Sequence, residues 1–164
     1  MSGQPIYNLE KSLWTHADYE QMDWHDCKIH GLSIEYNGGW GSDLLLDIDY
    51  IFQWVQAEKP GQPITFFIAP CTLVFKDAYG LHLNINDREN ALGPLAIEEL
   101  YIKDTTEVET NKFAYTWGID LQNGSIEFNS FGMQQIVRLQ PVYSQYQIID
   151  TEARGGVSFS RVPC

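Results

Sequence analysis

Basic side chains are scarce in this sequence of 164 residues. It has 22 aspartates and glutamates but only 10 lysines and arginines, and its formal net charge at pH 7 is −12. Nucleic acids and anionic membranes are polyanions, and proteins bind them by neutralising phosphates with lysine and arginine. The composition therefore argues against nucleic acid and against a membrane as partners. It suits a protein that meets a cation or a basic protein.

Cysteine is scarce as well, and long apolar runs are missing. Cys27, Cys71 and Cys164 are widely spaced and odd in number. A disulfide framework is therefore not expected, and free thiols in a reducing compartment fit better. No stretch approaches the roughly eighteen apolar residues of a spanning helix. Residues 1–5 have neither the basic nor the apolar region of a secretion signal, so we expect a cytoplasmic protein.

The apolar residues that are present follow the two-residue period of β-strands. Residues 28–36 and 43–51 alternate between apolar and polar side chains. Asn123-Gly124 is a preferred hairpin turn and predicts paired strands between residues 113 and 128. Eight or nine short strands of this kind predict a mainly β fold. The architecture expected is a single antiparallel β-sandwich or a strongly curved, partly closed sheet.

The length of the chain predicts one β-rich domain over residues 1–164. Residues 1–14 are expected to form an N-terminal arm. Residues 15–22 form the one short helix predicted, with Thr15 as its cap. Residues 155–164 begin with two glycines and carry a proline near the end, and a terminal segment of this kind is expected to fray.

Chemically active side chains are densest between Trp24 and His30, where two histidines, a thiol and an aspartate lie close together. Imidazole and carboxylate groups suit a divalent metal or acid–base chemistry. His25 and Asp26 are therefore the candidate catalytic and metal-ligating residues. The alternative is that both cap the start of a strand by hydrogen bonds to the backbone. The sequence has no HExxH motif and no CxxC pair, so we expect neither a metal nor another cofactor.

Strand geometry decides whether this group joins Asp47 and Asp49 in one site. Matching the apolar faces of the two strands pairs Leu32 with Ile48. Successive side chains point to opposite faces, so His30 then lies on the apolar face and both aspartates lie on the reverse face. This register predicts that the histidines and the aspartates do not gather round one point.

Several polar or aromatic side chains are placed where a partner can reach them. The predicted hairpin register puts Asp120 opposite Glu127, and like charges in that position are relieved by a cation or a basic partner. Trp40 stands in a glycine-rich turn, where an aromatic ring can anchor a partner. Together with Asp47 and Asp49 on the polar face of their strand, these residues form the candidate binding surface.

Three segments carry a resemblance to known proteins: Trp24-His25-Asp26, the stretch from Leu46 to Trp54, and the stretch from Ala69 to Phe75. Over its central part the chain resembles an uncharacterised family of small, mostly bacterial, β-rich proteins. The resemblance implies a β-rich fold and no particular activity. In general form the chain is also similar to immunity-type proteins, which neutralise a partner toxin, and that analogy implies a binding protein.

These features predict a cytosolic, non-enzymatic binding protein whose acidic surface meets a basic protein partner, as in an immunity protein or an adaptor. One alternative is a small-ligand-binding protein or a metal-dependent enzyme that uses the region of His25 and Asp26. Another is a structural subunit or homodimer, in which a sheet edge or an apolar sheet face pairs with a second copy.

Overall fold

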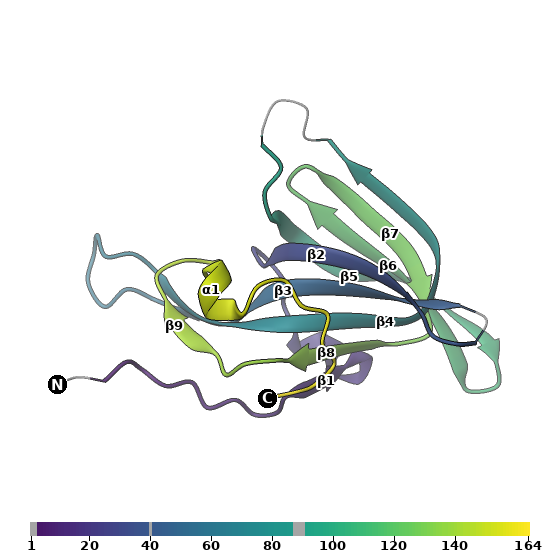
Figure 1. Cartoon of the computed structure of the whole chain (residues 1–164), viewed down its shortest axis with the longest axis horizontal. Helices are drawn as coiled ribbons and strands as arrows, with labels where there is room; N and C mark the ends of the chain where they lie inside the picture. The colour runs from purple at the N-terminus through teal and green to yellow at the C-terminus, as the bar shows by residue number, and fades with distance from the viewer. Residues whose placement is uncertain (1–2, 40, 87–90) are drawn as a thin grey trace.

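Nine antiparallel strands form one sheet in the computed structural model, which describes residues 3–39, 41–86 and 91–164 (Figure 1). The strands are β1 (Leu13–Thr15), β2 (Lys28–Tyr36), β3 (Ser42–Val55), β4 (Thr65–Ile85), β5 (Leu95–Glu109), β6 (Lys112–Leu121), β7 (Gly124–Ser130), β8 (Met133–Val137) and β9 (Val142–Ser144). The helical elements are the 3-10 helix η1 (His16–Gln21) and the α-helix α1 (Thr151–Arg154). Strands hold 55% of the described residues and helices 6%, which confirms the prediction of a mainly β protein.

The longest strand, β4, takes part in two halves of the sheet. The strand order is β1-β8-β4-β3-β2-β5-β6-β7, and β9 pairs with the start of β4. The first part of β4 lies between β3 and β8, whereas residues 79–85 pair with β7. The chain bends at Asp77 and Gly80, which have positive φ angles of 47° and 64°. In Figure 1 the distal part of β4 rises with β6 and β7 away from the half that contains β3.

The helix predicted near the N-terminus is a 3-10 helix, and the α-helix in the described residues lies near the C-terminus. Thr15 caps η1: its hydroxyl accepts the N–H of Ala17 at 3.2 Å, and Asp18 accepts the N–H of Thr15 at 2.9 Å. None of the residues of η1 is buried, so no packing face extends it into a longer α-helix. In the described part of the chain, no helix has the length and apolar character needed to cross a membrane.

The β6–β7 hairpin has the predicted apolar face but a different register. Asp120 lies opposite Ser125 and not opposite Glu127. The pairing is thus displaced by two residues, and such a shift keeps every side chain on its face. The apolar side chains of this face are buried, namely Trp117, Ile119, Leu121, Ile126 and Phe128.

Gly124 accounts for the displaced register. It begins β7 instead of forming the turn, and it pairs with Leu121 of β6 and with Ile85 of β4. A Cβ atom at this position would lie 1.9 Å from the carbonyl oxygen of Asn84. The close approach of two strands therefore requires the glycine, and the turn is made by the two residues before it.

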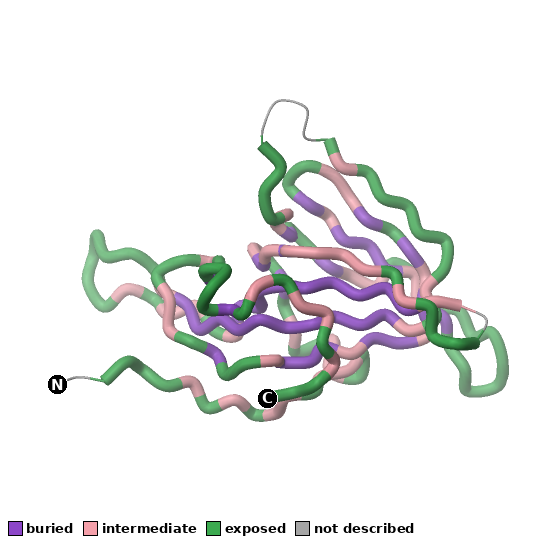
Figure 2. The backbone as a smooth tube through the Cα atoms, viewed as in Figure 1, coloured by how far each residue is buried: buried purple, intermediate pink, exposed green. Residues whose placement is uncertain are grey.

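β3 is buried on both of its faces. Every residue from Asp43 to Ile51 is buried, as the continuous purple stretch in Figure 2 shows. One face, with Leu44, Leu46 and Ile48, belongs to the main core that also contains Trp117. The opposite face is covered by the end of the chain, residues 150–164, which we call the C-terminal segment.

The C-terminal segment is held against the sheet, whereas the sequence predicted that its last ten residues fray. The N–H of Cys164 donates to the carbonyl of Val137 at 2.9 Å, and the Thr72 hydroxyl donates to the carbonyl of Ser160 at 2.8 Å. In Figure 1 the segment crosses the front of the sheet from α1 to the C-terminus. Contacts with distant strands, which composition does not reveal, therefore order this end of the chain.

The alanine variant of Gly124 tests the close approach of β4 and β7. Gly124→Ala is expected to lower the free energy of unfolding by about 3 kcal/mol, because the added methyl group must displace the carbonyl of Asn84. Urea unfolding followed by tryptophan fluorescence measures the loss. Gly93→Ala is the matched control, since a Cβ atom there meets nothing within 4 Å. Equal stability of the two variants would contradict the strand arrangement.

Candidate functional site

Three aspartates on the covered face of β3 form the centre of the candidate site. Asp43, Asp47 and Asp49 alternate with apolar residues that point into the main core. Their exposed fractions are only 2%, 0% and 0%. Removing an ionised carboxylate from water is costly unless cations and hydrogen-bond donors surround it. The burial of these side chains therefore dictates what the rest of the chain must place over them.

Arg154 at the end of α1 lies between two of these aspartates. Its Nη2 and Nη1 atoms donate to the two carboxylate oxygens of Asp47 at 2.7 and 2.8 Å, and its Nε donates to Asp49 Oδ1 at 3.0 Å. Two parallel bonds between a guanidinium and a carboxylate are stronger and more specific than a single contact. α1 presents this arginine because Asp150 caps its start and Gly155, with a φ of 78°, ends it.

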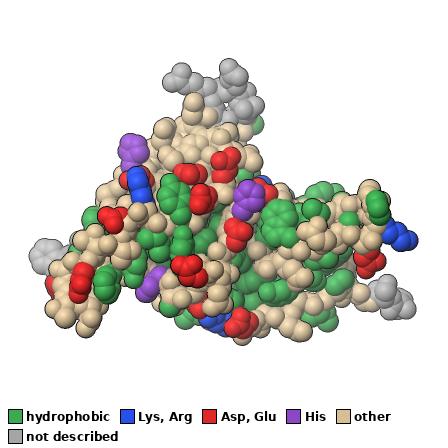
Figure 3. All heavy atoms as spheres, turned by 180° about the vertical axis from the view of Figure 1, so that it is seen from behind, with side chains coloured by type: hydrophobic (Ala, Val, Ile, Leu, Met, Phe, Trp, Pro, Cys, Tyr) green, Lys and Arg blue, Asp and Glu red, His purple; other side chains and the backbone are tan. Residues whose placement is uncertain are grey.

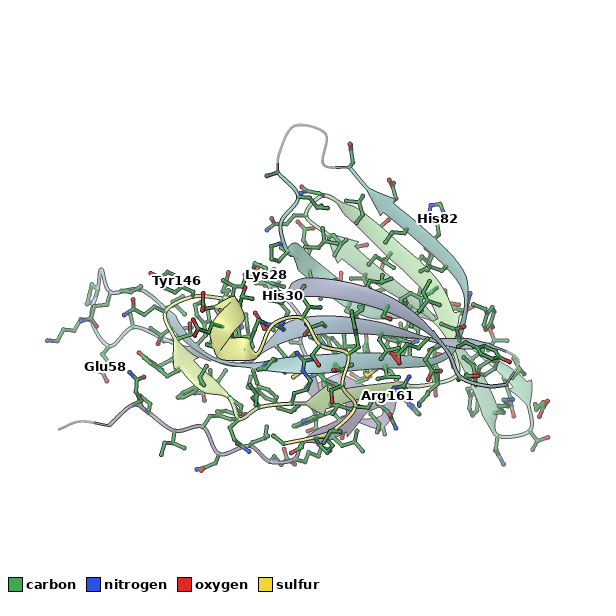
Figure 4. The ribbon with its side chains drawn as sticks, viewed as in Figure 1. Lys28, His30, Glu58, His82, Tyr146 and Arg161 are labelled. Carbon is green, nitrogen blue, oxygen red and sulfur yellow. The ribbon has the colours of Figure 1, made fainter. Side chains whose placement is uncertain are left out.

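Two further arginines balance the charge. Arg138, just after β8, donates from Nη2 to Asp47 Oδ1 at 2.7 Å, and Arg161 donates from Nη1 to Asp43 Oδ2 at 2.9 Å. We call the resulting group the buried arginine–aspartate cluster, formed by Asp43, Asp47, Asp49, Arg138, Arg154 and Arg161. Arg161 is 35% exposed, so the cluster reaches the surface at that end (Figure 4). With three acids and three bases, the cluster is neutral overall.

Backbone N–H groups and a histidine occupy further carboxylate lone pairs. The N–H of Ser158 donates to Asp47 Oδ2 at 2.9 Å, and the N–H of Ile149 donates to Asp49 Oδ2 at 2.8 Å. The Nε2 atom of His30 lies 2.7 Å from the same Asp49 oxygen. The end of the chain is therefore bound to β3 through its backbone as well as through its arginines.

Hydrogen bonds keep Asp43, Asp47 and Arg154 ionised although all three are buried. Burial alone would raise the pKa of Asp47, but hydrogen bonds from Arg154, from Arg138 and from the Ser158 N–H outweigh burial and lower it. Burial also opposes the ionisation of Asp43, and its donors again lower the pKa. The pKa of the Arg154 guanidinium is raised, because its carboxylate partners outweigh the effect of burial. These contacts are therefore ion pairs at neutral pH.

His30 lies on the aspartate side of the sheet, so the prediction that alternation separates it from Asp49 is wrong. A β-bulge between Ile29 and Gly31 leaves His30 as an extra residue in β2, and a bulge re-aims the side chain that it carries. Figure 4 shows His30 beside the C-terminal segment. A Cβ atom on Gly31 would lie 2.9 Å from the ring of Phe159, so the glycine lets this segment pack closely.

The buried thiols and carboxylates are poorly suited to nucleophilic chemistry. Burial raises the pKa of Cys27 to about 12 and also raises the pKa of Cys71, and a protonated thiol is a weak nucleophile. Both oxygens of Asp49 are engaged by Arg154, Ile149 and the histidine. Across residues 3–39, 41–86 and 91–164, no group of three or more His, Cys, Asp or Glu side chains is arranged to hold a metal ion. The contacts of the cluster suit a structural role, in which it fixes the C-terminal segment to β3.

The structure places His25 and Asp26 next to each other at the surface. His25 Nε2 lies 3.6 Å from Asp26 Oδ2, and the His25 side chain is 57% exposed. The Nδ1 atom lies 2.9 Å from the carbonyl of Glu98, and this hydrogen bond, with support from nearby carboxylates, raises the pKa of His25. Asp26 accepts a hydrogen bond from Gln147 at 3.0 Å. The two side chains therefore tie β5 and the turn after β9 to the start of β2.

The predicted acidic binding surface is only partly available. Asp47 and Asp49 are buried, so their prediction as contact residues is wrong. Asp120 and Glu127 do not face each other: the first accepts a hydrogen bond from a tyrosine of β5 at 3.3 Å and the second from a lysine of β5 at 3.1 Å. Both of these side chains keep contact with solvent. Trp40 lies outside the described residues.

The three arginines of the cluster were not among the functional residues predicted from the sequence. One local signal was present for Arg154, because Asp150 at a helix start and Gly155 just after a basic residue are typical helix boundaries. That signal predicts a short helix ending in Arg154. It does not predict that the helix docks on β3, since the contact joins residues 107 positions apart.

Arg154→Ala is expected to destabilise the protein strongly, because it leaves Asp47 and Asp49 buried without their main cation. Removing one partner of a buried ion pair costs about 3–5 kcal/mol. Arg161→Ala is the comparison variant, because its partner Asp43 keeps the N–H of Asp77 at 3.0 Å and the Nζ atom of Lys76 at 3.6 Å. Arg161 itself is partly exposed, so the loss should be smaller, about 1–2 kcal/mol. Urea unfolding at neutral pH gives both values. A loss for Arg154→Ala no larger than the loss for Arg161→Ala would contradict the role assigned to the cluster.

Comparison with protein-family models, with curated proteins and with solved structures found no match for this chain. The resemblance to a family of small β-rich proteins therefore stays a prediction.

Proposed function

We propose that the protein is a non-enzymatic binding protein whose acidic surface meets a basic protein partner. The distribution of charge supports this proposal. The buried arginine–aspartate cluster contains equal numbers of acids and bases and contributes no net charge. The formal net charge of −12 therefore belongs entirely to residues outside the cluster. A surface with such an excess of one sign attracts partners of the opposite sign and orients them.

Acidic side chains gather where β5 passes the 3-10 helix. Glu20, Asp23 and Glu99 line a shallow hollow of about 260 Å³, and Glu98 is exposed next to Glu99 on β5. On the face drawn in Figure 3, carboxylate side chains are spread over the middle of the molecule, with few lysine and arginine side chains among them. This region is the best candidate for the first encounter with a basic partner.

We take the scaffold of this surface to be a strongly curved, partly closed sheet. The last strand in the order, β7, pairs with the distal part of β4, so the sheet closes on that side. On the other side, β2 and β5 pair only at Lys28 and Ile29 of β2 and then diverge. Curvature of this kind lets the apolar faces of the two halves share one core. It leaves the outer faces and the unclosed side available to a partner.

The two alternative functions have less support. A homodimer would bring together two surfaces with a net charge of −12 each, and like charges oppose association at low ionic strength. An enzyme built on His25 and Asp26 would have to work with an exposed imidazole whose Nδ1 atom already contacts a backbone carbonyl. Neither a homodimer nor an enzyme at His25 and Asp26 would make use of the excess of acidic residues outside the neutral buried cluster.

The proposal predicts that association with the partner slows as salt rises. A partner recovered by cross-linking in cells and then purified should bind roughly tenfold more slowly at about 0.5 M salt than at about 0.05 M, because screening shortens the reach of surface charge. Glu99→Lys should slow association more than Glu58→Lys, which makes the same charge change in the β3–β4 loop (Figure 4). An association rate that is independent of salt, or a partner without basic surface, would contradict the proposal.

A further inference from the structure

Two strand edges in the described part of the chain have no strand partner along most of their length. β2 pairs with β3 on one side along its whole length apart from the bulge at His30, but on its other side it pairs with β5 only at Lys28 and Ile29. The distal part of β4, residues 79–85, pairs with β7 on one side and shows no strand pairing on the other. Free N–H and C=O groups along a strand edge are a template on which another strand can pair.

An apolar slot lies between these two edges. A hollow of about 310 Å³ is lined by residues that include Leu32 of β2 and Leu83 of β4, and a hollow of about 160 Å³ is lined by residues that include Ile34 of β2 and Leu81 of β4. Residue numbers rise along β2 as they fall along β4, so the two edges run antiparallel past each other. We call the space bounded by residues 29–34 and 79–85 the β2–β4 slot.

Apolar side chains in this slot are unusually accessible. Ile34 is 61% exposed, Leu83 50% and Leu81 40%. Between the two leucines, His82 points outward from the sheet in Figure 4. Residues of the distal part of β4 therefore alternate: apolar side chains face the slot, and the polar side chains between them face solvent. Clustered exposed apolar surface of this kind marks an interaction site more often than chance exposure.

We propose that an extended segment of the basic partner enters the β2–β4 slot and pairs with the free edge of β2, while its alternate side chains pack on the apolar residues of β4. The inference rests on the proposed function and names the contact segment of the partner. Strand addition satisfies the free backbone groups of an edge and uses pockets for every second side chain. The free stretch of β2, residues 30–36, is about 23 Å long, enough for a short peptide strand.

Charge selects a foreign segment over a second copy of this chain. A copy would bring a further net charge of −12 to the slot, whereas a segment that alternates basic and apolar residues would place its cations along an acidic protein. The apolar residues of such a segment face the slot and its basic residues face outward. We therefore expect the sequence of the partner segment to alternate lysine or arginine with β-branched or aromatic residues.

Synthetic peptides of about eight residues test this inference. The probe alternates lysine with valine and tyrosine, a matched peptide carries N-methyl groups on alternate amides, and a third replaces lysine with serine. The full-length protein should bind the unmodified probe at least tenfold more tightly than the N-methylated one, because the methyl groups block backbone pairing without changing charge. Bound probe should also slow amide hydrogen exchange at residues 30–36.

Two protein variants separate the slot from general charge attraction. Leu83→Glu adds an acid inside the slot and should weaken binding of the lysine probe at least tenfold. His82→Glu adds the same charge on the opposite side of the same strand and should leave binding unchanged or slightly stronger. If charge alone attracted the probe, both variants would bind it more tightly. Circular dichroism and urea unfolding of each variant establish that the fold is kept.

The results with these peptides show separately whether the slot binds an extended segment and whether the partner must be basic. Equal, salt-sensitive binding of the methylated and unmethylated lysine peptides would overturn the slot and leave the acidic surface as the contact. Tight binding of the serine peptide with the same exchange pattern would support the slot and overturn the requirement for a basic partner. Absence of binding by any peptide overturns the slot. Protection of residues 30–36 without peptide, in a dimer seen by sedimentation, would make the occupant a second copy and overturn the proposal.

Discussion

Burial of three carboxylates on one face of β3 constrains the rest of the structure. Asp47 and Asp49 are removed from water, and the cations that pair with them come from the far end of the chain. Arg154 brings α1 onto the sheet, and the hydrogen bonds that follow it lay the C-terminal segment over β3. Apolar residues can often replace buried ion pairs without loss of stability. The cluster is therefore best understood as the feature that specifies where this segment docks.

Local periodicity predicted the strands and their apolar faces, because both follow from contacts between near neighbours. The face of the β6–β7 hairpin is buried although its register is displaced, since a shift of two residues preserves the face. The aspartates of β3 could not be placed in this way. Polar residues that alternate with apolar ones usually face water, and here a segment without strand periodicity covers them. The bulge that turns His30 toward Asp49 likewise has no local signature.

Charge pairing in the interior also determines the character of the surface. Three of the few basic residues are committed to the cluster, and the acids that remain outside it are left in excess. Within the described residues, the same sheet leaves one edge of β2 and one edge of the distal part of β4 without strand pairing along most of their length. A protein with an acidic exterior and a free apolar strand edge combines long-range attraction with a place for short-range contact. The two proposals on function follow from this combination.

Amide hydrogen exchange in the C-terminal segment tests the central claim most directly. The N–H of Ser158 donates to Asp47, and the N–H of Cys164 donates to the carbonyl of Val137. If the cluster anchors this segment as an integral part of the fold, both amides should exchange only through global unfolding, with the same opening free energy as the amides of β3. Exchange of these two amides at the rate of an unstructured chain, while β3 stays protected, would contradict the account.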